Sequence, residues 1–198
     1  MAPNWFIALP VPADPWFDSR FDPPSPAFRR FQPQDLHLTV AFLGAVEETA
    51  ARSAFDWITT TLDRGPGRPW QPPLQVTLGP LVPLGNPQRY SALSLLLNQG
   101  QEAAIALIDQ LQNPARSIAG LPPETRSPKP HVTVLRPKRR ATEADRTQGL
   151  AWAETLNHSP HPTAPLASFV LTLDQIALYT WHEVRDDKLF KIVSNHTL

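Results

Sequence analysis

The sequence predicts an α+β protein built on antiparallel sheets. Segments that alternate like strands outnumber those with helical spacing, and the last three follow one another with no helix between them. This order favours antiparallel pairing, because strands and helices alternate along the chain in a doubly wound parallel sheet. The chain has 198 residues, of which 41% are hydrophobic and 18% charged, enough for a sizeable core. Since no low-complexity segment or linker divides it, we expect one domain spanning 1–198.

In the first half of the chain, short apolar runs bounded by turn residues predict four strands, at 4–9, 36–43, 74–84 and 89–98. The proline-rich segment 10–34 is expected to hold at most a short helix near 15–20. A longer helix is predicted at 47–63, because five apolar side chains there can share one face: Ala50, Ala54, Trp57, Ile58 and Leu62.

The second half of the chain is expected to begin with a helix at 101–115 and to contain another at 142–158, with Thr142 and Asp145 near its cap. Its predicted strands are 131–136, 168–173, 175–181 and 188–194. The basic run 136–140, "RPKRR", is interpreted as a solvated turn.

The charge balance and the residue usage exclude several classes of protein. Lys+Arg and Asp+Glu both total 18, so net charge alone would not make the protein bind nucleic acid non-specifically. Cysteine is absent, which excludes disulfides and thiolate metal sites and fits a reducing cytoplasm. No apolar run is long enough to span a bilayer, and the N-terminus lacks the basic region of a signal peptide. We therefore expect a cytoplasmic protein.

Two predicted strands carry the same polar pair. Residues 37–40 read His-Leu-Thr-Val and residues 131–134 read His-Val-Thr-Val, each within an extended apolar run. Because successive strand side chains alternate, the histidine and threonine of each pair share one face and their apolar neighbours face the core. One such pair would most simply be a hydrogen-bonded histidine on a half-exposed sheet, but a matched pair favours chemistry. A third copy, His161 and Thr163, lies in a proline-rich loop and is attributed to chance.

Two histidines and two threonines suit phosphoester cleavage. In-line displacement at phosphorus needs a base for the nucleophile and an acid for the leaving oxygen, and two histidines can divide these roles near neutral pH. Threonine hydroxyls can donate hydrogen bonds to the charged phosphate oxygens. A zinc site is the alternative use of paired histidines, but no His-x-His or carboxylate pair stands beside either motif. We therefore expect no metal and no cofactor.

The two motifs resemble those of the two-histidine (2H) phosphoesterase superfamily, especially its RNA 2′,3′-cyclic phosphodiesterases, also called 2′-5′ RNA ligase-like proteins. The blocks "WFIALPVP", "LHLTVAFLG", "KPHVTVLRP" and "IALYTW" are similar to that family in order and spacing. The resemblance implies a bilobal fold in which two antiparallel sheets, flanked by helices, face each other across a central cleft.

The resemblance also implies roles for five residues. His37 would protonate the leaving ribose oxygen, and His131 would activate water. Thr39 and Thr133 would bind phosphate oxygens, and Arg136 is a further candidate for this. Strict alternation puts Arg136 on the face opposite His131, so that it reaches the phosphate only if the strand bends before Pro137.

The expected activity is hydrolysis of a 2′,3′-cyclic phosphodiester, at RNA ends or on small nucleotides, to a 2′-phosphate by a monomer. The alternative is a module that binds nucleotides or RNA ends without chemistry. Lys129, Arg126 and His182 are weaker candidates for the site. Five aromatic residues are possible stacking partners for a base, and the sequence singles out none of them: Trp5, Phe42, Tyr90, Tyr179 and Trp181.

Overall fold

The computed structural model describes residues 3–64, 69–158, 165–184 and 188–198. Nine strands lie in these ranges: β1 (Trp5–Pro10), β2 (Phe28–Arg30), β3 (His37–Gly44), β4 (Leu74–Leu84), β5 (Ala92–Leu97), β6 (His131–Pro137), β7 (Val170–Leu173), β8 (Gln175–Trp181) and β9 (Phe190–Thr197). The α-helices of the same ranges are α1 (Glu48–Asp63), α2 (Gln101–Ile118) and α3 (Glu143–His158). None of them is long and apolar enough to cross a membrane.

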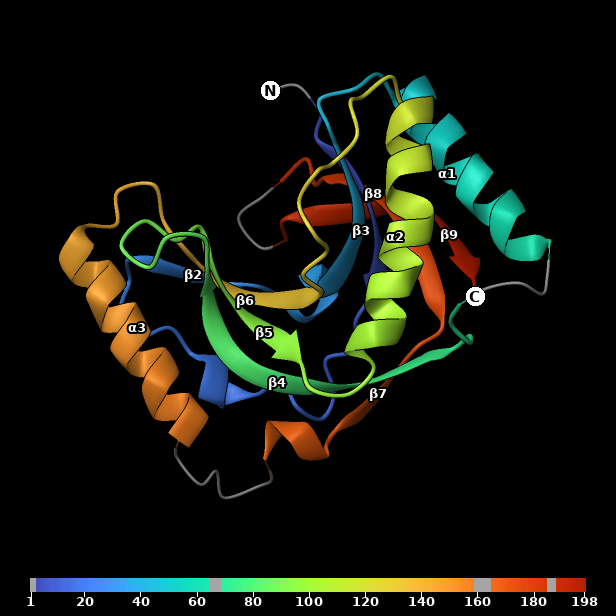
Figure 1. Ribbon diagram of the computed structural model, residues 1–198. Helices are drawn as coiled ribbons and strands as arrows, with labels where there is room; N and C mark the ends of the chain where they lie inside the picture. Colours follow the sequence, from blue (N-terminus) through green and yellow to red (C-terminus); the bar gives the residue numbers. More distant parts are fainter. Residues whose placement is uncertain (1–2, 65–68, 159–164, 185–187) are drawn as a thin grey trace.

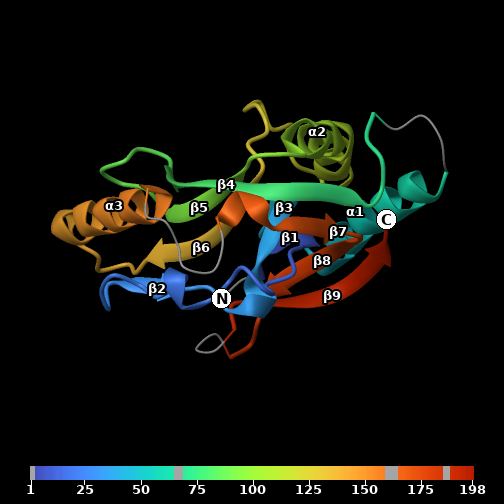
Figure 2. The same cartoon turned by 90° about the horizontal axis from the view of Figure 1, so that it is seen from below.

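All strand pairs are antiparallel, in the order β7-β4-β5-β6-β3-β1-β8-β9, with β2 added beside β6. The two halves of this order join through a single residue pair, Leu38 in β3 and Val132 in β6. Figures 1 and 2 show the resulting sheet to be strongly curved, with α1 and α2 together at one end and α3 at the other. The two motif strands are therefore the central neighbours of the sheet.

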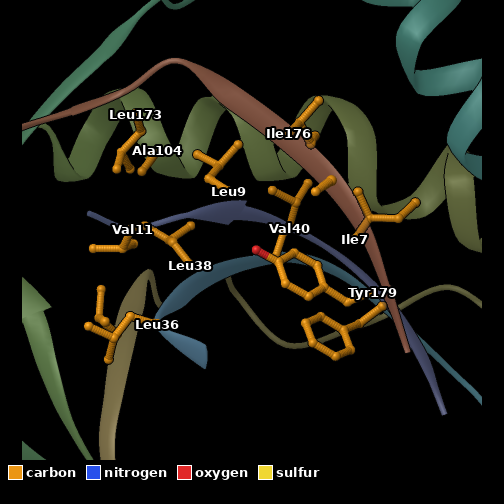
Figure 3. Close-up of a cluster of buried hydrophobic side chains, with 14 of the residues drawn as sticks. Ile7, Leu9, Val11, Leu36, Leu38, Val40, Ala104, Leu173, Ile176 and Tyr179 are labelled. Carbon is orange, nitrogen blue, oxygen red and sulfur yellow. The ribbon is translucent and has the colours of Figure 1, made fainter. Parts of the chain in front are cut away.

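The helices cover the apolar face of these strands. Helix α2 packs on β3, and α1 packs on β1 and β8. Ile7, Leu9 and Leu38 are fully buried on this face, and Figure 3 shows part of the cluster. Alternation then turns the neighbouring side chains, including that of His37, to the face away from α2.

The expected α+β fold with two antiparallel halves flanked by helices is confirmed. One local expectation, that 10–34 holds at most a short helix, was wrong, because this segment also contains β2. The segment near 15–20 forms a single 3-10 turn at Ser19–Phe21, where the carboxylate of Asp18 accepts the backbone N–H of Arg20. Strand β2 was not predicted at all, since three residues with two arginines carry no strand pattern of their own. It is extended because it pairs with β6.

Candidate active site

The motif pairs lie next to each other across the junction of the two halves. The register that pairs Leu38 with Val132 sets His37 opposite Thr133 and Thr39 opposite His131. Opposed residues of an antiparallel pair point to the same side, so all four polar side chains share the face away from α2. The two histidines occupy diagonal positions on the two strands, and residues in such positions are expected to lie about 7–8 Å apart. The structure therefore brings together the two motifs that the sequence singled out.

A β-bulge follows the motif in β3. Thr39 pairs with Ala8, whereas Ala41 pairs with Ile7, so Val40 is an extra residue in β3. The bulge shifts the alternation by one, and Phe42 pairs with Phe6, whose ring lies 4.8 Å from that of His37. Phe42 is consequently on the histidine face, and its side chain is 50% exposed.

Strand β6 has the equivalent bulge. Thr133 pairs with Ser94 and Leu135 pairs with Leu93, so Val134 is the extra residue. Arg136 is thereby turned to the face of His131, contrary to strict alternation. Its guanidinium lies 5.4 Å from the ring centre of Phe31, which itself is 6.5 Å from the ring of His37. This bulge is the bend before Pro137 that Arg136 needs in order to reach the phosphate.

Both motif histidines make the same hydrogen bond to the backbone. The Nδ1 of His37 lies 2.6 Å from the carbonyl of Asp35, and the Nδ1 of His131 lies 2.6 Å from the carbonyl of Lys129. A carbonyl can only accept, so each Nδ1 carries the hydrogen and donates it. In a neutral ring the lone pair is then on Nε2. Both rings are therefore fixed in the same tautomer, with Nε2 as the atom that can exchange a proton.

His37 is enclosed by aromatic rings. The ring centres of Phe6, Phe190, Tyr179 and Phe31 lie 4.8, 5.3, 5.6 and 6.5 Å from its own. The pKa of His37 is lowered to about 4, mainly by burial among these rings and also by the charges of Arg136 and His131, while the hydrogen bond to Asp35 acts in the opposite direction. His37 is consequently neutral at neutral pH in the free protein.

Burial also lowers the pKa of His131, and the positive charges of Lys129 and Arg136 act in the same direction. The charge of Arg136 thus reaches both rings. The site therefore presents two neutral imidazoles beside the positive charge of Arg136, which would attract an anion. A bound anion would in turn make both imidazoles easier to protonate.

The two threonines differ in their surroundings. Thr133 is 6% exposed, and its hydroxyl lies 3.0 Å from that of Ser94, which is fully buried. Thr39 is half-buried and faces Ala8, which has no polar side chain. If Ser94 donates to Thr133, the hydrogen of Thr133 stays available for another acceptor. Ser94 was missed at the sequence level, where its only signal is one hydroxyl within the apolar run "ALSLLL".

Asp35 is a second residue that the sequence did not single out. It is fully buried, and its carboxylate accepts backbone N–H groups from Leu189 and Phe190 at 3.0 Å and from Gln32 at 3.4 Å. The same residue offers its carbonyl to His37. Asp35 therefore connects the start of β9 to the backbone that orients His37. Its position directly before a motif strand was the available signal.

The weaker candidates lie at varying distances from the pair. Lys129 contributes its carbonyl and its charge to His131, whereas the guanidinium of Arg126 pairs with Glu124. His182 lines a separate hollow of about 860 Å³ beside Trp181. The chance motif, His161 and Thr163, is outside the described residues.

Of the possible stacking residues, Phe42 alone is exposed on the histidine face; Trp5, Tyr90 and Tyr179 are buried, and Trp181 is largely covered. Within the described ranges, no three His, Asp or Glu side chains gather in a way that could hold a metal ion.

Comparisons with solved structures place this geometry in a known fold. Escherichia coli LigT matches 100% of this chain and 99% of its own, with 22% identity and a TM-score of 0.63, in a crystal structure with 3′-AMP. TT0787 of Thermus thermophilus matches 98% of this chain and 97% of its own, with 17% identity and a TM-score of 0.57. Usb1 of Kluyveromyces marxianus matches 96% of this chain and 97% of its own, with 14% identity and a TM-score of 0.52.

No family model matches the chain, and no curated protein sequence matches it. At these identities the structural likeness establishes the fold. It confirms the fold that the resemblance implied.

Proposed function

We propose that this chain is a 2H phosphoesterase that hydrolyses a 2′,3′-cyclic phosphodiester, at an RNA or nucleotide end, to a 2′-phosphomonoester without a metal. The observation that carries the proposal is the matched pair of histidines, each with Nδ1–H held by a backbone carbonyl, on adjacent strands and on one face. We further propose that 1–198 works as one domain and as a monomer in the cytoplasm.

In the proposed reaction, a water molecule attacks phosphorus and the bond to the ribose O3′ breaks. Nε2 of His131 takes the proton from water, and Nε2 of His37 gives its proton to O3′. The product carries the phosphate on O2′, and the two rings have exchanged protonation states with each other. A second proton transfer through solvent restores the starting state.

Three side chains would hold the phosphate during this step. The hydroxyls of Thr39 and Thr133 donate to its non-bridging oxygens, and Arg136 offsets their charge. Thr133 can donate there when its hydroxyl accepts from that of Ser94. The bulge at Val134 supports the role of Arg136, since it turns this side chain to the face of the histidines.

Phe42 would stack on the nucleobase. The bulge at Val40 turns its ring to the histidine face, and half of its side chain is exposed. Crystal structures of LigT contain 3′-AMP, NADP⁺ and ATP, so a protein with this fold accommodates purine nucleotides.

The protonation states set the pH dependence of the proposed reaction. Both ring pKa values are lowered in the free protein, so the form with His37 protonated is a minor one at neutral pH. Binding of the phosphate anion raises the pKa of each ring by direct charge attraction. We therefore expect a bell-shaped profile of kcat/KM with its optimum below pH 7.

A module that binds nucleotides without chemistry is the second candidate. The observation that favours it is the lowered pKa of His37, to about 4, which leaves the proposed acid without its proton at neutral pH. Binding of cyclic-phosphate nucleotides without turnover from about pH 5 to about pH 8, roughly 1.5 units on each side of the ordinary histidine pKa, would establish this module and refute the hydrolase.

The deciding experiment compares two leaving groups in the presence of EDTA. With a 2′,3′-cyclic phosphate, His37→Ala and His131→Ala should each lower kcat/KM by roughly 10²–10⁴-fold. A 4-nitrophenyl phosphodiester releases 4-nitrophenolate, a leaving group that needs no proton from an acid. On this substrate His37→Ala should therefore keep most of the wild-type rate, whereas His131→Ala should not. Activity that depends on added divalent metal would contradict the proposal. Equal losses on both substrates would contradict the assignment of His37 as the acid.

A further inference from the structure

The sequence contains a basic run, 136–140, that the proposed reaction uses only in part. We propose that a set of cations on β2, β6 and the turn after β6 binds the upstream phosphates of an RNA chain, so that the favoured substrate is an RNA end and not a mononucleotide. This inference rests on the proposed function. The set, called the basic strip below, consists of Arg29, Arg136, Lys138, Arg139 and Arg140.

The strip begins at the histidines. Arg136 acts electrostatically on both rings, so its guanidinium belongs to the neighbourhood of the reacting phosphate. Arg29 is paired directly with Arg136 across β2 and β6. Opposed residues point to the same side, so the two guanidinium groups share the histidine face. Two positive charges on this face would attract an anion.

The neighbouring arginine shows that this orientation is specific. Arg30 follows Arg29 in β2 and points to the opposite side, where it donates to the backbone carbonyl of Asp18, pairs with Asp22 and lies over the ring of Phe17. Of the two β2 arginines, Arg29 is the one that alternation turns toward the face of Arg136.

The strip continues into the turn that leads to α3. The turn is held in place by hydrogen bonds from the N–H of Lys138 to the carbonyl of Ala27, at 2.8 Å, and from the N–H of Ala141 to the carbonyl of Lys138, at 2.9 Å. The side chains of Lys138, Arg139 and Arg140 are all exposed. Among the ion pairs of the described part of the chain, none involves these three residues.

Two acidic residues follow the turn directly in the described part of the chain. Glu143 and Asp145 follow in the first turn of α3, and the carboxylate of Asp145 accepts the N–H and hydroxyl of Thr142. The 198 residues together have a formal net charge of zero. The strip is therefore a local positive feature on a neutral protein, and a polyanion would be drawn to it rather than to the whole surface.

Length and polarity make RNA the fitting ligand. Lys138 lies seven positions after His131, which corresponds to about 23 Å at the rise of an extended strand. This is room for several nucleotides beside the reacting phosphate. A 2′,3′-cyclic phosphate closes the 3′ end of an RNA, so every further phosphate of the substrate lies upstream. A cyclic mononucleotide has no such phosphates and gains nothing from the strip beyond Arg136.

The test compares adenosine 2′,3′-cyclic phosphate with a tetranucleotide that ends in the same group. The double variant Arg139→Ala/Arg140→Ala removes two positive charges away from the histidines. For the tetranucleotide, kcat/KM should fall about tenfold at low salt, and the slope of log kcat/KM against log salt should become shallower by about 1.4. For the mononucleotide, kcat/KM should not change.

Arg64→Glu is the matched control, because it changes the net charge by the same amount at an exposed position at the end of α1. It should leave both substrates at wild-type values. Equal kcat/KM of the wild-type protein for the two substrates would overturn the inference and leave the proposed function standing. An equal loss in Arg64→Glu would also overturn it, since net charge would then explain the effect.

If neither substrate were hydrolysed, the proposed function would fail. Measurements of RNA binding would then test the role of the basic strip independently. Fluorescence anisotropy with a labelled tetranucleotide carrying a 3′-phosphate should show weaker binding by Arg139→Ala/Arg140→Ala than by Arg64→Glu. Equal affinities of the two variants would refute the strip. Displacement of the RNA by polyglutamate of equal charge at the same concentration would identify a surface for any polyanion, and would refute the assignment to RNA.

Discussion

The stability of the fold should fall at mildly acidic pH because of His37, and His37→Gln should remove this dependence. The ring is enclosed by Phe6, Phe190, Tyr179 and Phe31, and its pKa is lowered from 6.5 to about 4. In the unfolded chain the ring is exposed and titrates near its ordinary value. Between these two pKa values the unfolded state therefore binds more protons than the folded state, and stability rises with pH.

The magnitude follows from the size of the shift. A pKa lowered from 6.5 to about 4 corresponds to about 3 kcal/mol of unfolding free energy, present above pH 6.5 and lost as the pH falls toward 4. Urea denaturation at pH 7, 6, 5 and 4 measures this loss. The difference in unfolding free energy between the wild type and His37→Gln should shrink by about 3 kcal/mol over this range.

His158→Gln, at an exposed position of α3, is the control for the change from histidine to glutamine. This variant keeps His37, so its stability should still fall between pH 7 and pH 4. An NMR titration of the imidazoles gives the pKa of His37 directly. A value above 6, or parallel stability curves for the wild type and His37→Gln, would refute the claim that this ring is held neutral by burial.

Three further predictions concern single residues. Thr133→Val should lower kcat/KM by roughly 10- to 1,000-fold, and Ser94→Ala should lower it by less, because Ser94 only orients Thr133. Steady-state kinetics on a cyclic phosphate measures both effects. A larger loss in Ser94→Ala than in Thr133→Val would contradict this order. Asp35→Ala leaves the buried N–H groups of Leu189 and Phe190 without their acceptor, so urea denaturation should show a loss of roughly 2–5 kcal/mol; a loss below about 1 kcal/mol would contradict the connection to β9. His161→Ala should keep wild-type activity, since its motif is attributed to chance, and loss of activity there would show that the two motifs were chosen wrongly.

The sequence predicted the motif strands because their alternation is regular up to Thr39 and Thr133. It could not predict which face the later residues occupy. The bulges at Val40 and Val134 shift the alternation, and only pairing with β1 and β5 defines them. This is why Phe42 was one aromatic residue among five.

Residues that act through contacts with parts of the chain distant in sequence also could not be predicted from the sequence. Ser94 meets Thr133 across two strands, and Asp35 meets Leu189 at the start of β9. Each lies in or beside an apolar run whose pattern it does not disturb. Strand β2 was missed for a related reason, since its extended form depends on β6 and not on its own residues.

The central claim is that both histidines serve one phosphate group, and a crystal structure with bound 2′-AMP tests it most directly. The account predicts that Nε2 of His37 and Nε2 of His131 both lie within about 2.6–3.2 Å of phosphate oxygens, with the hydroxyls of Thr39 and Thr133 at similar distances. A phosphate held by only one of the two rings, or a nucleotide bound instead in the hollow beside Trp181, would contradict it.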